Sequence, residues 1–258
     1  MPFPGRWGLT DAKLIAETFS SRIFKVRLPD GTPAVVNHLK PFDDVEDELR
    51  GAHLLAWRCG EGLVRLLEIE GSSMLLEYAG DTMLSHALEQ DGDRAATEIA
   101  AGVMARLHSP SSRPAPPDLQ PLRQRFADLF RKAEGQAGRR SPYVQAAAVA
   151  ERLLSDQRDV KPLHGDLHHE NIMHGPRGWL AIDPKGVLGD PAFDAERIAG
   201  MAEVFARTLG QSPRRILDHV VAYGCLSAAW HAGDGNDKDE NRELAVAAAV
   251  GKVRDLSF

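Results

Sequence analysis

Residues 163–173, LHGDLHHENIM, bring three histidines, two acidic residues and an asparagine into eleven positions. Side chains of these types transfer protons and bind metal ions, so the segment is a candidate site of chemistry. A zinc site is one alternative, because His164 and His168 are four residues apart and would share one face of a helix. No HExxH pattern is present, however, and Pro162 and Gly165 disfavour a helix here. A structural loop without chemistry is a second alternative.

The spacing of HGDLHHEN favours a third alternative, a phosphoryl-transfer loop with the pattern H-x-D-L-x-x-x-N. In such a loop the aspartate, Asp166, accepts the proton of the acceptor hydroxyl, and the asparagine, Asn171, binds magnesium. A strand that delivers a second carboxylate to the metal should follow. WLAID at 179–183 ends in Asp183, twelve residues after Asn171. The loop spacing, the strand and its terminal aspartate together favour phosphoryl transfer over the other two alternatives.

The elements that must position this loop fall into a strand-rich first part and a helical remainder. Two alternating runs at 22–28 and 33–39 flank the turn letters PDGT and predict a β-hairpin. A helix is predicted at 43–59, capped by Asp43 or Asp44, followed by an antiparallel pair at 63–70 and 72–80. Further helices are predicted at 82–90, 93–108, 119–134, 143–156, 194–209, 213–231 and 239–254. The sequence therefore predicts an α+β fold with a strand-rich N-lobe, residues 1–80, a helical C-lobe, residues 81–258, and a cleft between them.

Composition and charge narrow the class of partner. The net charge of −6 and the pI near 5.9 argue against nucleic acid and are compatible with a cationic small molecule. No run approaches 18 consecutive apolar residues, so no membrane span is expected. The first residues lack the pattern of a signal peptide, so we expect a cytoplasmic protein. Nothing in the sequence implies a protein partner.

Several stretches together resemble a known family. They are ETFSSRIFKVRLPDGTPAVV, DELRGAHLLAWRCG, MLLEYAGDTMLSHALE, LHGDLHHENIM, RGWLAIDPKGVLGDPAFD and AYGCLSAAW. These stretches resemble the aminoglycoside and hydroxyurea antibiotic resistance kinases, in particular the streptomycin 6-phosphotransferases, over nearly the whole chain. The resemblance implies a protein-kinase-like two-lobed fold, ATP and Mg²⁺ as cofactors, and phosphoryl transfer to a hydroxyl of streptomycin.

The resemblance also assigns roles by motif position. Asp166 becomes the catalytic base, Asn171 and Asp183 the metal ligands, while His164 braces the loop and Asp194 hydrogen-bonds its backbone. Only ten residues separate Asp183 from Asp194, which leaves no room for a regulated activation loop and favours a small-molecule kinase over a protein kinase.

Nucleotide and acceptor contacts are expected elsewhere in the chain. The resemblance places the hinge that meets adenine at Glu77, Tyr78 and Ala79. A Gly-rich loop is absent, and TFSS at 18–21 offers backbone N–H groups and the hydroxyls of Ser20 and Ser21 to the phosphates instead. Streptomycin carries guanidinium groups, so carboxylates should line its pocket. The candidates by position are Asp234, Asp237 and Glu240, for which a solvated loop is the competing explanation.

Asn37 is the main departure from the family pattern, which predicts a lysine on this strand, near the nucleotide phosphates. A two-residue Asp-Gly turn pairs residues whose numbers sum to 61, which turns Asn37 and Val26 inward and both Lys25 and Lys40 outward. Glu48, beside the apolar stripe of the predicted helix, would then have an amide partner at best, or would only border the stripe and extend to water.

Two further functions stay open. One is a nucleotide-binding pseudokinase of the same fold with weak turnover. The other is a kinase for a different small alcohol or amine, because the segment after GDPAFDAE is shorter than in the family and helps to form the acceptor pocket.

Overall fold

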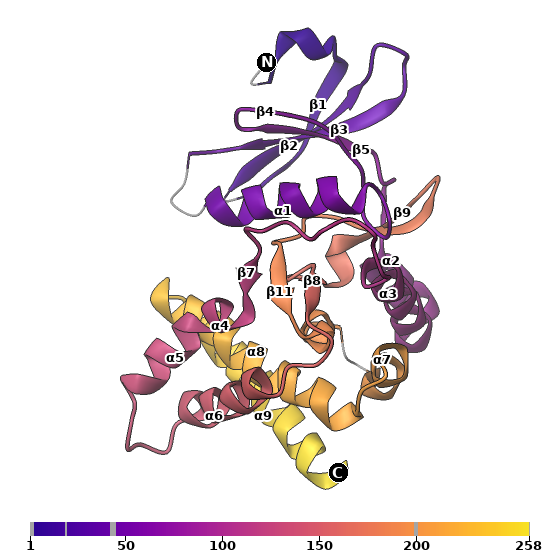
Figure 1. The fold of residues 1–258 in the computed structure, drawn as a ribbon. Helices are drawn as coiled ribbons and strands as arrows, with labels where there is room; N and C mark the ends of the chain where they lie inside the picture. Colours follow the sequence, from indigo (N-terminus) through magenta and orange to yellow (C-terminus); the bar gives the residue numbers. More distant parts are fainter. Residues whose placement is uncertain (1–2, 19, 42–44, 199–200, 258) are drawn as a thin grey trace.

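The computed structural model describes residues 3–18, 20–41, 45–198 and 201–257, and Figure 1 shows a sheet with one helix above a larger helical part. The proposed caps Asp43 and Asp44, and Phe19 in the TFSS segment, lie outside the described residues. None of the helices in these ranges has the length and apolar character that crossing a membrane requires.

The upper part is a five-stranded antiparallel sheet with the order β1-β2-β3-β5-β4. The strands are β1 Thr10–Glu17, β2 Ser21–Arg27, β3 Pro33–Leu39, β4 Leu66–Glu70 and β5 Ser73–Glu77. On one face, Val26, Val36 and Leu75 pack with the buried side chains of Phe3 and Trp7. The other face is covered by helix α1, Val45–Arg58, which lies between the sheet and the helical part (Figure 1). Strand β1 was not predicted, because its side chains are almost all exposed and show no alternation.

The hairpin of β2 and β3 is formed as predicted but in a different register. Ile23 pairs with Asn37 and Lys25 with Val35, so the paired numbers sum to 60 and not to 61. The reason is a turn of three residues, Pro29 to Gly31, in which the amide of Leu28 donates to Thr32 and Gly31 adopts a φ of 83°. The shift of one residue exchanges the faces, so Asn37 still faces the cleft, but with Lys25 and not with Val26.

The lower part is helical. Its helices are α2 Leu84–Asp91, α3 Asp93–Leu107, α4 Leu122–Arg125, α5 Ala127–Glu134, α6 Pro142–Ser155, α7 Ala202–Leu209, α8 Pro213–Gly233 and α9 Asp237–Ser257. The predicted helix at 119–134 begins only at residue 122 and is interrupted at Phe126. The predicted helix at 194–209 is replaced by a 3-10 helix, Pro191–Ala195, and by α7, with 199–200 outside the described residues.

Two small sheets lie between the lobes and carry the loop of interest. One contains β6 Thr82–Met83, β9 Ile172–Gly175 and β10 Gly178–Ala181, and the other β7 Gln120–Pro121, β8 Lys161–Leu163 and β11 Val187–Gly189. The loop leaves β8, passes through a 3-10 helix at His169–Asn171 and enters β9. Because β9 pairs antiparallel with β10, the chain then returns along the same line.

Candidate active site

The β9–β10 hairpin brings Asn171 and Asp183 to the same end of the sheet. The amide of Ile182 donates to the carbonyl of Asn171 at 2.9 Å, which aligns the two residues that flank the hairpin. Both side chains line one cavity, and Asp183 has a φ of 56°, a left-handed conformation that few non-glycine residues adopt. Non-glycine residues in this left-handed conformation are often found at functional sites, where the surrounding structure fixes the direction of the side chain.

His164 connects the loop with this hairpin through both of its ring nitrogens. Its Nε2 is 2.8 Å from the carbonyl of Ile182, and the amide of Asp166 donates to its Nδ1 at 3.3 Å. Burial lowers the pKa of His164, so the ring is neutral, with a proton on Nε2 to donate and a lone pair on Nδ1 to accept. Both nitrogens are therefore used by main-chain bonds, an arrangement that fits a brace and not a zinc ligand.

Asp194 ties down the start of the loop from a fully buried position. Its Oδ2 accepts the amide of His164 at 2.9 Å and its Oδ1 accepts the amide of Gly165 at 2.8 Å. The ring of His108 contacts Oδ2 at 2.8 Å. The sequence motif gave no indication of His108, which comes from the end of α3.

Asp166 lies at the apex of this loop. The side-chain amide of Asn171 donates to the main-chain carbonyl of Asp166 at 2.9 Å, and Arg197 donates to the carboxylate of Asp166 at 2.6 Å. Burial alone would raise the pKa of Asp166, but the cation of Arg197 and the nearby His168 lower it below its usual value. Asp166 is therefore an ionised acceptor at neutral pH. Arg197 was not predicted, because no local pattern indicates that a residue 31 positions later reaches the loop.

Replacing Arg197 with methionine should move the acidic limb of the pH profile of kcat/KM to higher pH. The guanidinium holds the pKa of Asp166 down, so its removal raises that pKa, and a higher pH is needed to keep the carboxylate ionised. Initial rates from pH 4 to 9 would measure the shift. Arg207→Met, at an exposed position of α7, is the matched control and should leave the limb in place. An unchanged limb in the Arg197 variant would show that Arg197 does not set the ionisation of Asp166.

A cavity of about 470 Å³ between the sheet, α1 and the β9–β10 hairpin gathers the residues expected to bind nucleotide. The lining contains Ser20, Ser21, Asn37, Glu48, Glu77, Tyr78 and Ala79, together with Asn171 and Asp183. Apolar side chains that include Val35, Leu76 and Met173 line it as well, and residues 78–80 cross its edge outside any strand. An apolar slot beside main chain that lies outside the strands fits a planar base, and the hydroxyls of Ser20 and Ser21 fit the phosphates of a nucleotide.

The carboxylate of Glu77 is not available to bind a nucleotide, because it already has protein partners. It forms an ion pair with Arg177 at 2.6 Å and accepts the amide of Arg65 at 3.0 Å. Glu77 therefore braces the hinge against the lower lobe, and its main-chain amide is also in use, since it donates to the carbonyl of Arg65 at 2.9 Å.

Asn171 and Asp183, which line the nucleotide cavity at the β9–β10 hairpin, fit a magnesium ion. Asn171 uses its amide nitrogen for the loop, which leaves its oxygen for a metal, and the carboxylate of Asp183 is partly exposed to the cavity. Among the described residues, no three His, Cys, Asp or Glu side chains form a metal-binding group. A divalent ion here would take its remaining ligands from phosphate oxygens and water, as magnesium at nucleotide sites does.

Asp183→Asn should weaken the magnesium-dependent part of ATP affinity. Loss of a residue that merely supports a ligand costs about tenfold or more in metal affinity, so loss of a ligand should cost at least as much. Calorimetric titration of ATP with and without magnesium measures the difference. Equal magnesium dependence in variant and wild type would remove Asp183 from the metal site.

Two lysines were candidates for the cation missing at Asn37. Lys25 shares the face of Asn37, contrary to the prediction, but donates to the hydroxyl of Tyr78 at 2.6 Å and to Asp81 at 3.2 Å. Lys40 donates to the carbonyl of Thr18 at 2.6 Å and pairs with Glu17 at 2.9 Å, next to the TFSS segment.

Lys185 is the lysine that contacts Glu48, so the prediction that Glu48 lacks a cationic partner is wrong. Its Nζ is 3.0 Å from Glu48 and 3.1 Å from Asp183. Burial alone would lower the pKa of Lys185, but the carboxylates of Asp183 and Glu48 raise it, so the ammonium stays charged. This contact was missed because the two partners are 137 residues apart and only the fold brings them together.

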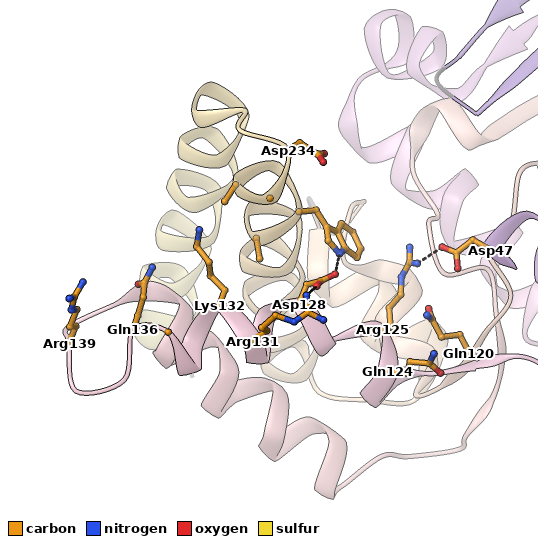
Figure 2. A pocket seen from close by; sticks show the side chains of 15 residues that line it. Asp47, Gln120, Gln124, Arg125, Asp128, Arg131, Lys132, Gln136, Arg139 and Asp234 are labelled. Atoms are coloured by element: carbon orange, nitrogen blue, oxygen red, sulfur yellow. Dashed lines mark hydrogen bonds and ion pairs between the residues drawn. The ribbon is translucent and has the colours of Figure 1, made fainter. Parts of the chain in front are cut away.

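A larger cavity, of about 1080 Å³, lies on the other side of the loop and is lined by α4, α5 and the end of α8 (Figure 2). Arg125 connects this cavity with α1 and with the loop of Asp166. It pairs with Asp47 of α1 at 2.8 Å and approaches the carbonyl of Gly165 at 3.5 Å. Asp128 accepts the indole N–H of Trp230 at 3.0 Å, and the guanidinium of Arg125 lies 4.9 Å from the ring of Trp230.

Of the three carboxylates expected to bind the acceptor, the structure places only Asp234 in this cavity. Asp237 begins α9 and is not among the lining residues. Glu240 accepts the hydroxyl of Tyr143 at 2.5 Å and lies 3.8 Å from Lys132. Asp47 and Asp128, which the sequence did not indicate, line the cavity in addition to Asp234.

Comparisons with known proteins agree with this geometry. Residues 6–235 match the model of the family described as aminoglycoside/hydroxyurea antibiotic resistance kinase. Streptomycin 3''-kinase of Klebsiella pneumoniae is 37% identical over 97% of this chain and 99% of that protein. Streptomycin 6-kinase of Streptomyces griseus is 35% identical over 96% of this chain and 86% of that protein.

Among solved structures, a choline/ethanolamine kinase family protein from Mesorhizobium loti superimposes with a TM-score of 0.69. The match covers 93% of this chain and 87% of that chain at 14% identity. The predicted α+β, protein-kinase-like fold is thereby confirmed. The chain belongs to the aminoglycoside/hydroxyurea antibiotic resistance kinase family and is a phosphotransferase that acts on a hydroxyl group.

Proposed function

We propose that this protein transfers the γ-phosphoryl group of ATP, with magnesium, to a hydroxyl of a cationic aminoglycoside such as streptomycin. The observation that carries the proposal is the joint placement of three residues by one loop and one hairpin. Asn171 and Asp183 line the nucleotide cavity, and Asp166 lies next to Asn171, whose side-chain amide donates to the main-chain carbonyl of Asp166 at 2.9 Å. The proposal requires ATP, which the cytoplasm supplies. It divides the chain near residue 80 into a nucleotide-binding lobe and a lobe that binds the acceptor.

In this proposal each residue has a defined task. The main chain of 77–79 binds adenine, and Ser20 and Ser21 donate hydrogen bonds to phosphate oxygens. Asn171 and Asp183 would hold magnesium, which neutralises the charge of the transferred group. Asp166 orients the acceptor hydroxyl and accepts its proton, and the bonds of the loop to Asp194 keep that carboxylate in place.

The larger cavity supports a small, cationic and strongly polar acceptor. Its carboxylates Asp128 and Asp234 and the aromatic face of Trp230 are groups that bind guanidinium ions, although Asp128 already pairs with Arg131. Basic side chains line the same cavity and suit the hydroxyl groups of an aminoglycoside: Arg125, Arg131, Lys132 and Arg139. The relatives named above are kinases of two different positions of streptomycin, 3'' and 6, so the proposal specifies the compound class and not the position.

Turnover of ATP with and without streptomycin tests the proposal. Streptomycin-dependent release of ADP, together with mass spectrometry of a singly phosphorylated product, is the expected result. Nucleotide binding without turnover would identify a pseudokinase. Turnover only with other alcohols or amines would keep the reaction type and replace the acceptor.

A further inference from the structure

We propose that Lys185 supplies the cation that Asn37 cannot supply, from the opposite lobe, and that it positions Asp183 and Glu48 for nucleotide binding. This inference rests on the proposed function. The observation behind it is that Nζ of Lys185 lies between the two carboxylates, 3.0 Å from Glu48 and 3.1 Å from Asp183. In the general kinase arrangement the lysine that pairs with the helix glutamate comes from a strand of the sheet. Here it comes from the segment directly after the metal-ligand candidate.

The backbone of this segment is fixed against α1. A Cβ at Gly51 would overlap the carbonyl oxygen of Pro184, and a Cβ at Gly186 would crowd the carbonyl of Arg50. The amide of Lys185 donates to the carbonyl of His164 at 2.7 Å. Both neighbours of Lys185 therefore touch the helix that carries Glu48, while Lys185 itself is tied to the catalytic loop.

The position of Asn37 also favours this assignment. Asn37 lines the same cavity as Glu48 and Asp183, and its Oδ1 has no hydrogen-bond partner among the described residues. An amide supplies no net charge. Lys25 donates to the hydroxyl of Tyr78, and Lys40 donates to the carbonyl of Thr18 and pairs with Glu17, so neither of them contacts Glu48 in the way that Lys185 does. Without Lys185, the negative charges of Glu48 and Asp183 would face the phosphates with no cation of the protein to balance them.

Lys185 is therefore a positioning residue that acts through its two partners. It neutralises Glu48, which otherwise would be a buried, unpaired charge. Its ion pair with Asp183 at 3.1 Å also fixes the position of that carboxylate. The same contacts join α1 to the lower lobe, so the ion pair also sets how the two lobes meet at the phosphate end of the cavity.

Calorimetric titration of ADP in the presence of EDTA measures how the charge of Lys185 affects nucleotide affinity when no metal is bound and no turnover takes place. Lys185→Met retains the length of the side chain and removes its charge, and it should lower ADP affinity by on the order of tenfold. Asn37→Lys alone should change affinity by less than about twofold, because Glu48 already has its cation. The double variant Asn37→Lys/Lys185→Met should recover most of the lost affinity. Lys252→Met, exposed on α9, controls for a general loss of positive charge.

Two results would overturn the inference. One is unchanged ADP affinity in a folded Lys185→Met variant. The other is a gain of about tenfold from Asn37→Lys alone, which would show that the cation is still missing. Should Lys185→Met fail to fold, the Asn37→Lys variant and the double variant still decide between these outcomes. If the wild-type chain does not bind ADP, the proposed function fails together with this inference. If it binds ADP and Lys185→Met binds it equally well, only this inference fails.

Discussion

Asp166→Ala should lower kcat for phosphoryl transfer by about three orders of magnitude, within the range that positioned general bases contribute. The carboxylate is ionised and is held at the apex of a loop whose first amides are bound by Asp194. An alanine keeps the loop but leaves the acceptor hydroxyl without a proton acceptor and without an orienting partner. Single-turnover rates with streptomycin measure the loss.

Nucleotide affinity should change little in the same variant, because Asp166 is not among the residues that line the nucleotide cavity. Glu151→Ala is a suitable control, since Glu151 is also a carboxylate paired with an arginine, Arg123, but on the exposed surface. This control should retain full turnover. An Asp166→Ala enzyme that kept more than a tenth of kcat would show that another group acts as the base.

The centre of the candidate site could be predicted from the sequence because its residues are close in the chain. Asp166 and Asn171 are five residues apart, and Asp183 follows within one hairpin, so local spacing determines their relation. The β2–β3 and β4–β5 pairs and most of the helices were predicted for the same reason, since turn residues and periodicity are local properties. Of the β9–β10 hairpin, only the strand that ends at Asp183 was predicted.

The residues that were missed depend on contacts between distant segments. Whether Glu48 has a cationic partner is decided by Lys185, and the ionisation of Asp166 is decided by Arg197. No pattern along the chain contains these pairs. The register error has a different cause, because the letters PDGT are compatible with a turn of two or three residues. The choice between them reverses the face of every side chain on β2 relative to β3.

Asp194→Asn should destabilise the fold by about 3 kcal/mol and also lower turnover of the molecules that remain folded. The carboxylate accepts the amides of His164 and Gly165 with different oxygens and also contacts the ring of His108. An asparagine must present its NH₂ group to one of these amide donors, whichever way it is turned. One buried N–H then lacks an acceptor, and the loop that carries Asp166 loses one of its two anchors.

The neighbouring Asp190 provides a matched control for this variant. It is also completely buried, and it accepts the amides of Ala192 and Arg158 and the side chain of Arg215, but it has no contact with the loop. Urea denaturation should therefore show a comparable loss of stability for Asp190→Asn, while kcat per folded molecule should fall only in Asp194→Asn. Equal kcat in the two variants would mean that Asp194 supports the fold in general and does not hold the base. A loss of kcat confined to Asp194→Asn would instead show that Asp194 holds the catalytic loop in its active geometry. The two substitutions remove the same charge from the same segment, so that loss of charge could not explain a difference between them.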